Sequence, residues 1–162
     1  MADWTTPESY AYKEVLGSDK LNTQVKENLI ALREGKVAFT SGRVNCSGTT
    51  NTTTTADITG ATVSITPDAA SYLFVVMVAD LSSSVAGDIV TVDLKVDGVA
   101  ETPQCIFTAP VAGYRATLVQ VYRIALTAAA HTIKMTLNRA SGTGTVTAQA
   151  NQTGFDYLLF SQ

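Results

Sequence analysis

Few side chains in this sequence are of types that perform catalysis. His131 is the sole histidine, and a hydrolytic triad needs a nucleophile and an orienting acid beside such a base. No GxSxG motif surrounds any serine or threonine of the chain, so no nucleophile is marked. His131 alternates in phase with Ile133, Met135 and Leu137, which predicts a core-facing position near the end of a strand. We therefore predict no catalytic residues.

The residue types that ligate metals are also poorly spaced. Cys46 and Cys105 lie far apart and form no CxxC pair, so with a single histidine they make no zinc site by local spacing. Asp88, Asp93 and Asp97 are of a type that binds calcium, but the alternation places Asp93 and Asp97 on the solvent side of a strand and its turn. We predict neither a metal site nor a cofactor. Whether the two thiols are paired stays open.

Composition excludes several classes of partner. Of the 162 residues, 46% are hydrophobic and 15% are charged, whereas soluble domains usually carry about 25% charged residues. The net charge of −3 offers no basic surface for nucleic acid. The longest apolar stretch, Tyr72 to Ala79, is too short to span a membrane, and Met1 to Trp4 lacks the basic start and apolar run of a secretion signal. We expect synthesis and assembly in a cytoplasm.

An amphipathic helix is predicted over residues 18–35. Ser18 is a favourable N-cap and Gly35 a favourable stop. One apolar stripe with spacings of four, four and three is made by Leu21, Val25, Leu29 and Leu32. A helix of about 15 residues is marginal alone, so the stripe needs a partner. Its own domain, a copy of the chain and a larger particle all remain open.

The segment before this helix is rich in aromatic residues, including the sole tryptophan, Trp4. An aromatic side chain near a chain terminus is costly to leave in water. We therefore expect Trp4 to dock on the chain's own β-domain, on a sister subunit or on a host structure. Together with the stripe of the helix, it forms the predicted attachment and assembly surface.

From residue 36 the hydrophobic period changes to two, which is typical of strands. Strands are expected at 37–46, 61–66, 72–81, 90–96, 99–108, 114–126, 131–137, 145–150 and 155–160. The Ser/Thr-rich tract 47–57 is either a flexible loop or an irregular edge strand. Short strands at regular spacing predict an antiparallel β-sandwich of jelly-roll type. The domains are then an attachment arm and helix, 1–35, and a β-sandwich head, 36–162.

Two of these strands have informative faces. Residues 72–81 are apolar at nearly every position, which is typical of a central strand covered on both faces. In 114–126, one face carries Leu118, Gln120, Tyr122, Ile124 and Leu126, and the other carries Val119, Val121 and Arg123. One of these faces must meet the core, so we expect the other to meet a neighbouring subunit. Asp97-Gly98 predicts a two-residue hairpin, and Pro103 predicts a sheet edge.

The residues Trp4-Thr5-Thr6, followed by the leucine–asparagine pattern of Leu21 to Leu29, resemble the N-terminal segment of small tailed-bacteriophage virion proteins. The β-rich remainder, with Ala130 to Met135, resembles the trimeric jelly-roll heads of phage fibres, spikes and decoration proteins, which are similar in shape to the tumour-necrosis-factor fold. No long shaft separates the two parts. The resemblance therefore implies a compact spike, a tail-tip or collar component, or a capsid decoration protein.

What the resemblance implies is a non-enzymatic virion protein that forms a homotrimer and contacts other virion proteins through residues 1–35. The first alternative is a receptor- or glycan-binding module, with Tyr114 as the nearest candidate for stacking on a sugar. The second is a polysaccharide hydrolase on the same fold that uses His131 or two carboxylates from distant strands. Nucleic-acid binding and membrane insertion are not expected.

Overall fold

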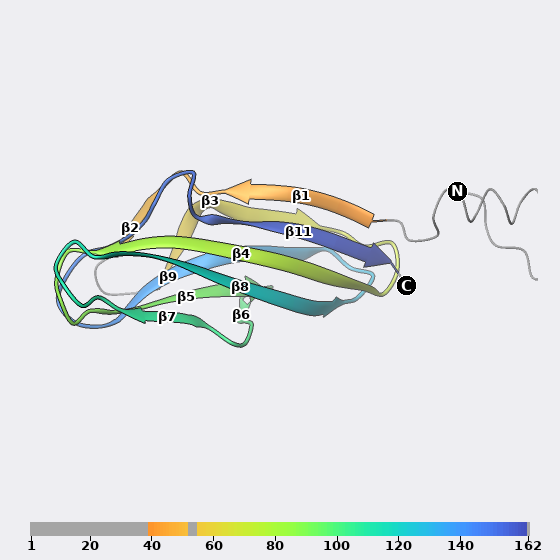
Figure 1. Cartoon of the computed structure of the whole chain (residues 1–162). Coiled ribbons are helices and arrows are strands. Elements are labelled where there is room, and N and C mark those ends of the chain that lie inside the picture. The colour runs from red at the N-terminus through yellow and green to blue at the C-terminus, as the bar shows by residue number, and fades with distance from the viewer. Residues whose placement is uncertain (1–38, 52–54, 162) are drawn as a thin grey trace, which may run out of the picture. The chain divides into compact units, whose positions relative to one another are not determined.

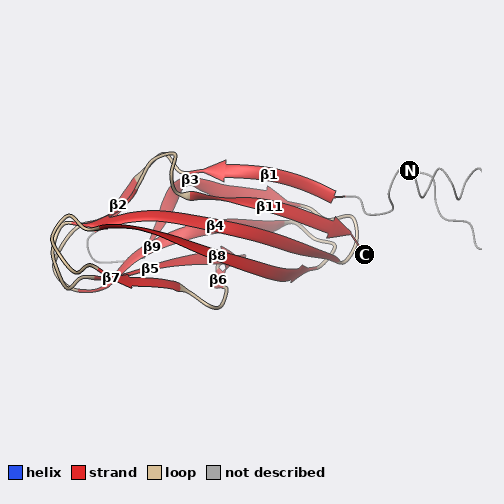
Figure 2. Cartoon of the chain, viewed as in Figure 1, coloured by secondary structure: helices blue, strands red, loops and turns tan. Residues whose placement is uncertain are grey.

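The computed structural model describes residues 39–51 and 55–161, which form two antiparallel β-sheets packed face to face (Figure 1). Strands joined by loops and turns make up these ranges, and no helix occurs in them (Figure 2). The predicted helix, its stripe of Leu21, Val25, Leu29 and Leu32, and Trp4 lie outside the described residues, as does the predicted domain boundary at residue 35.

Eleven strands are assigned in the described ranges. The first sheet, here called sheet A, contains β1 (Phe39–Asn45), β2 (Thr49–Asn51), β4 (Ser71–Ser83), β8 (Arg115–Leu126), β10 (Val146–Ala148) and β11 (Gly154–Ser161). Sheet B contains β3 (Ala56–Ile65), β5 (Ile89–Val96), β6 (Val99–Ala100), β7 (Cys105–Thr108) and β9 (His131–Ser141). In sheet A, β4 is central, because β8 lies on one side of it and β11 and β10 lie on the other.

The strand pairing is that of a jelly roll. Along the chain, β1 pairs with β11, β3 with β9, β4 with β8, and β5 with β7, so each pair is nested within the one before. Nested antiparallel pairs that alternate between two sheets are the wrapping of a jelly roll. The predicted antiparallel sandwich is confirmed for the described residues.

Alternation along the strands builds the core between the sheets. On β4 the inward residues Leu73, Val75 and Met77 have no exposed surface, and on β9 the same is true of Ile133 and Met135. Because successive side chains point to opposite faces, the residues that alternate with these core positions lie on the outer surfaces of the sandwich. The two outer surfaces differ sharply in chemistry.

Local signals placed several turns correctly. Asp97 and Gly98 have φ values of 51° and 85°, as a two-residue hairpin with positive φ at both positions requires. Pro103 lies between β6 and β7, which pair with β5 at the edge of sheet B. The predicted strand 61–66 was too short, because β3 begins at Ala56 and its register shifts between Asp57 and Thr62. Such a bulge breaks the simple alternation that marks a strand in the sequence.

The solvent-facing position predicted for Asp93 is wrong. The residue lies on the outer side of β5, as its phase requires, but it is 8% exposed. β5 is a middle strand, with β9 on one side and β7 on the other, so side chains of neighbouring strands cover it. Asp97, in the following turn, is exposed as expected.

Candidate functional site

The outer surface of sheet A carries a continuous apolar face, here called the outer apolar face. It is made by the outward side chains of β4, β8 and β11: Tyr72, Phe74, Val76, Val78, Val119, Val121, Leu158 and Phe160. Val119 and Val121 are 60% and 55% exposed, and Phe74, Val76 and Leu158 are about 40% exposed. Apolar residues scattered singly over a surface are ordinary, whereas a contiguous patch marks an interaction site.

Strand register shows that this face is contiguous. Val76 is the cross-strand partner of Val121, and Val78 is that of Val119. Phe74 pairs with Leu158 in the opposite direction, and its ring meets that of Phe160 edge to face at 5.5 Å between centroids. Directly paired residues on one face of a sheet touch each other. The exposed valines and aromatic rings therefore form one surface across three strands.

The outer surface of sheet B has the opposite character. Its outward positions on β3, β5 and β9 are polar or charged and include Asp57, Thr91, Asp93, Lys95, Thr132, Lys134, Thr136 and Asn138. Lys134 donates to the Asp57 carboxylate at 2.9 Å. Ile106, at the β7 edge, is an exposed apolar residue on this side, at 56%. A sandwich with one polar and one apolar outer surface has one side suited to water and one suited to a partner.

Charged groups on and beside the outer apolar face are paired within the chain. Arg43 binds Asp156 through two nitrogens, at 2.6 and 2.8 Å, and this hydrogen bonding lowers the pKa of the Asp156 carboxyl. Arg115 binds Asp80 in the same bidentate way, at 2.6 and 2.8 Å. The guanidinium of Arg123 lies 4.5 Å from the ring centre of Tyr72, which is a cation–π contact. The face therefore presents little uncompensated charge.

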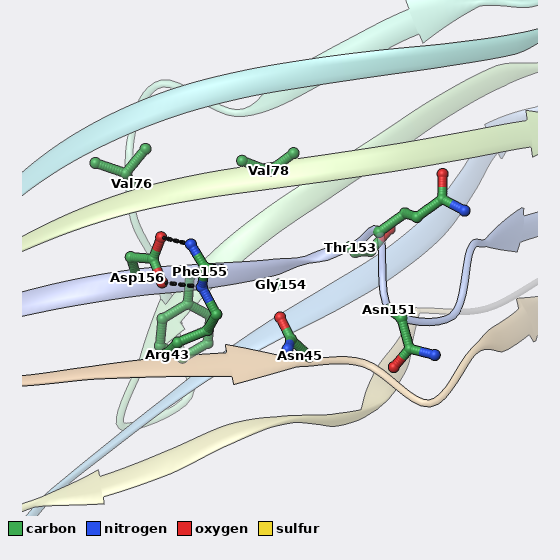
Figure 3. Close-up of a pocket in the computed structure, with 10 residues that line it drawn as sticks. Arg43, Asn45, Val76, Val78, Asn151, Thr153, Gly154, Phe155 and Asp156 are labelled. Atoms are coloured by element: carbon green, nitrogen blue, oxygen red, sulfur yellow. Dashed lines mark hydrogen bonds and ion pairs between the residues drawn. The ribbon is translucent and has the colours of Figure 1, made fainter.

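A pocket of about 150 Å³ opens at one end of the outer apolar face, and it is called here the Gly154 pocket. Val76 and Val78 of β4 line it, and the Arg43–Asp156 pair stands on one side, with Asn151 and Thr153 on the other (Figure 3). A side chain at Gly154 would collide with the backbone carbonyl of Val44. Glycine is therefore the residue that fits at this position, where β1 and β11 approach closely.

His131 forms the arrangement closest to catalytic chemistry in the described residues. Its Nδ1 lies 2.7 Å from the Asp97 carboxylate, and its Nε2 lies 3.2 Å from the Thr127 hydroxyl. The Nε2 atom also lies 3.3 Å from the Thr127 carbonyl, and Asp97 accepts the backbone N–H of Thr132 at 2.8 Å. These bonds tie the β5–β6 turn and the β8–β9 loop to the start of β9. A structural role accounts for every one of these contacts.

A buried carboxylate organises the loops at one end of the sandwich. Asp88 is fully buried and accepts hydrogen bonds from the Ser83 hydroxyl and from the backbone N–H groups of Thr143 and Gly144, the latter two at 3.0 and 3.2 Å. These bonds, that from Ser83 above all, lower the pKa of the Asp88 carboxyl against the opposing effect of burial. The residue joins the β4–β5 loop to the β9–β10 loop, at the end opposite the start of β1 (Figure 1).

A second group of buried polar side chains lies on sheet B. One carboxylate oxygen of Asp93 and the hydroxyl of its cross-strand neighbour Thr136 are buried without a hydrogen-bond partner. Burial raises the pKa of Asp93, and burial together with nearby negative groups raises that of Tyr122 to about 12.

Cys46 and Cys105 are buried free thiols. Among the described residues, no group of three or more potential ligands is placed to hold a metal ion, and no helix could span a membrane.

Sequence reasoning found part of this surface. It predicted that one side of β8 meets the core and the other meets a neighbouring subunit, without deciding which, and the structure places Val119 and Val121 on the side away from the core. It also predicted that residues 72–81 are covered on both faces, whereas the outer side of β4 is open in the single chain. The Gly154 pocket was missed, because β1, β4 and β11 meet there only in the folded chain. Tyr114 is 39% exposed and directly precedes β8, outside the residues that line the pocket.

Comparison with known proteins assigns no family to the chain. No protein-family model and no curated protein matches the sequence. Among solved structures, the Eiger TNF of S. frugiperda matches with 8% identity over 76% of this chain and 92% of its own, at a TM-score of 0.47. A carbohydrate-binding module, CBM36, in complex with calcium and xylotriose matches with 19% identity over 74% and 99%, at 0.38. The infectious bursal disease virus Gx strain matches with 11% identity over 76% and 36%, at 0.37. With TM-scores below 0.5, these similarities carry no conclusion about function.

Proposed function

We propose that this chain is a non-enzymatic structural protein of a bacteriophage particle, that it forms a homotrimer, and that residues 1–35 attach it to the particle. The observation that carries the proposal is the outer apolar face. β4 is largely apolar on both sides, β8 carries Val119 and Val121 on its outer side, and a single sandwich buries one side of each strand. Strands of this composition belong to sheets that are covered on both sides. A structural subunit acquires that second cover when it assembles.

Covering the outer apolar face as a whole would about offset the cost of association. Five apolar side chains of the face are between 39% and 60% exposed, and full burial of such a side chain contributes about 1.5–3 kcal/mol. Covering the remaining half of each would contribute roughly 4–7 kcal/mol in total by the same scale. Association of two proteins costs a comparable amount in lost motion. A surface of this size therefore supports association when it is covered as a whole.

The first test is the mass of the full chain in solution by light scattering, together with a search for the protein in purified particles. A trimer has three times the 17.1 kDa mass of the chain. Val121→Asp places a carboxylate on the outer apolar face and should reduce the mass to that of the monomer. Ile106→Asp is the matched control, because Ile106 is 56% exposed and Val121 is 55% exposed. A monomeric wild-type chain, or equal effects of the two substitutions, would contradict the proposal.

The pocket favours one rival function. Its rim of guanidinium, carboxylate and amide groups is of the type that binds sugar hydroxyls, which supports a glycan-binding module. Binding of soluble glycans on an array, lost in Asn45→Ala and kept in Ile106→Asp, would favour this rival over a purely structural role.

The Thr127–His131–Asp97 hydrogen bonds favour a second rival, a polysaccharide hydrolase. Release of sugars from cell-wall or capsular polysaccharide, lost equally in Thr127→Ala and His131→Ala, would establish it. Reduced stability without any activity in the wild type would leave these residues a structural role.

A further inference from the structure

We infer that the outer apolar face is self-complementary: its occupant is a second copy of this chain, and Val119 of one copy is seated over the Gly154 pocket of another. The inference rests on the proposed self-assembly and adds to it the contact that fixes how the copies meet.

The row runs across sheet A in strict register. Asn45 on β1 pairs with Gly154 on β11, Gly154 pairs with Val78 on β4, and Val78 pairs with Val119 on β8. At one end, Val119 is the most exposed side chain of the face, at 60%. At the other end, Gly154 and Asn45 are among the residues that line the pocket. A single row thus carries both a protruding apolar group and a hollow.

The hollow is large enough for an aliphatic side chain, and its lining combines apolar side chains with polar ones. A cavity of about 150 Å³ admits a group as large as benzene, and valine is smaller. Val76 and Val78 supply apolar contacts within it. The pocket also lies on the same surface as the group proposed to fill it. The Val119 end of one row therefore meets the pocket end of the row in the next copy, and three copies around a threefold axis repeat this head-to-tail contact until the ring closes.

Electrostatics permit contact between identical faces. The chain as a whole carries a net charge of −3, which opposes association of copies, but the pocket is bordered by an ion pair that is already neutral, Arg43 with Asp156. The second pair, Arg115 with Asp80, is likewise satisfied within the chain. Arg123 is the remaining cation on the face, and it lies over Tyr72. A copy that covers this surface meets no large like-charge field.

Disulfide trapping in the full chain tests the contact. Val119→Cys and Asn45→Cys are made in separate chains of different tag length, mixed, and oxidised mildly. Three inter-strand steps separate the two positions within one sheet, about 14 Å, which is too far for a disulfide inside one chain. We expect a mixed disulfide between the two chains, and none from either variant alone or from the wild type, whose own cysteines are buried.

The outcomes separate this inference from the proposed function. An oligomer without the mixed disulfide, or a disulfide formed by Val119→Cys with itself, would overturn the inference and leave self-assembly standing. A dimeric mass with the mixed disulfide would overturn the trimer and keep the contact. A monomeric wild type would overturn both.

A second measurement guards against variants that fail to assemble. Val119→Asp alone should lose the oligomer, and adding Asn45→Lys should restore it, because the two new charges then meet between copies. Failure of the pair to restore a mass that Val119→Asp has abolished would also count against the contact. So would an oligomer that Val119→Asp leaves unchanged.

Discussion

Asp88 is predicted to hold the loops at one end of the sandwich together, and Asp88→Ala tests this. The substitution removes an acceptor that serves three donors, the Ser83 hydroxyl and the N–H groups of Thr143 and Gly144. Hydrogen bonds to a charged group contribute about 1.5–3 kcal/mol each, and a buried donor left unpaired costs about 1–3 kcal/mol. Because Ser83 and the Thr143 N–H can turn to other partners or water, we expect a loss of about 3–5 kcal/mol.

A loss of that size is a large part of the 5–15 kcal/mol by which domains are stable, and chemical denaturation followed by circular dichroism measures it. Asp88→Asn should cost less, about 1–2 kcal/mol, because the amide oxygen still accepts from the two backbone N–H groups. Asp68→Ala, at an exposed aspartate, is the control and should change stability by less than about 0.5 kcal/mol.

The pH dependence of the unfolding free energy of Asp88→Asn gives an independent check. Since the pKa of Asp88 is lowered in the folded chain, its contribution to stability is present above the unfolded pKa of about 3.9 and is lost as the pH falls through the folded pKa. The difference in unfolding free energy between wild type and Asp88→Asn should therefore shrink on acidification below about pH 4. A constant difference from pH 7 to pH 3 would refute the reasoning.

Gly144 offers a double-mutant cycle on the same interaction. An added Cβ at this position would collide with the Asp88 carboxylate, so Gly144→Ala is expected to destabilise the chain. In the Asp88→Ala background that collision is absent, although the Val85 side chain still lies 2.9 Å from the Cβ position. The costs of the two substitutions should therefore be less than additive. Strict additivity would mean that the carboxylate does not occupy this place.

Three further predictions concern other parts of the sandwich. Burial raises the pKa of Asp93, so the stability that its protonated form provides is lost as the pH rises through the folded pKa. Asp93→Asn should therefore stabilise the chain at pH 7, and the gain in thermal midpoint should vanish near pH 3. A destabilised variant at pH 7 would contradict this. Because Tyr122 has a pKa of about 12 in the folded chain, the free energy of unfolding should fall as the pH rises from 10 to 12. Tyr122→Phe should remove that pH dependence and should lower the free energy of unfolding by about 1 kcal/mol, because it loses the hydrogen bond to the Pro103 carbonyl at 2.9 Å. Arg43→Ala should change unfolding free energy by at most about 1 kcal/mol, since both members of its ion pair are half-exposed or more; a larger loss would mean that the pair is sheltered, as in an assembled interface.

Periodicity and turn chemistry were sufficient for most of the architecture. Alternation assigned β5, β8 and β9, and the Asp97-Gly98 pair fixed the β5–β6 turn. The strand predicted at 99–108 is in fact two short strands, β6 and β7, and in the tract 47–57, left open between a loop and an edge strand, the structure has the three-residue strand β2. Strands of two or three residues are too short for alternation to mark them in the sequence. Their existence depends on pairing with β10 and β5, which is set by the whole fold. Local sequence carries no record of such long-range pairing.

Candidate functional residues divide in the same way. Val119 and Val121 were recognisable because both sides of one strand are apolar, a local property. The Gly154 pocket depends on β1, β4 and β11, which are far apart in the sequence and adjacent in sheet A. The solvent-exposed position predicted for Asp93 is wrong for the same reason. Alternation assigned Asp93 to the correct side of β5, whereas its burial depends on the strands on either side. The side of a strand on which a residue lies can be predicted from the local sequence, whereas the degree to which that side is covered depends on distant parts of the chain.

The disagreement over β4 is the most informative of these results. Residues 72–81 are composed as a strand with two covered faces, yet Phe74 and Val76 are about 40% exposed in the single chain. The outer side of β9 carries polar residues where the surface meets water, because Lys134 and Asn138 alternate along this strand with core residues. The same chain thus obeys the polar–apolar alternation on one outer surface and departs from it on the other. Because an apolar surface left in water gains nothing from that departure and risks aggregation through it, the composition of β4 favours a state in which its outer side is covered, as the proposed assembly would cover it.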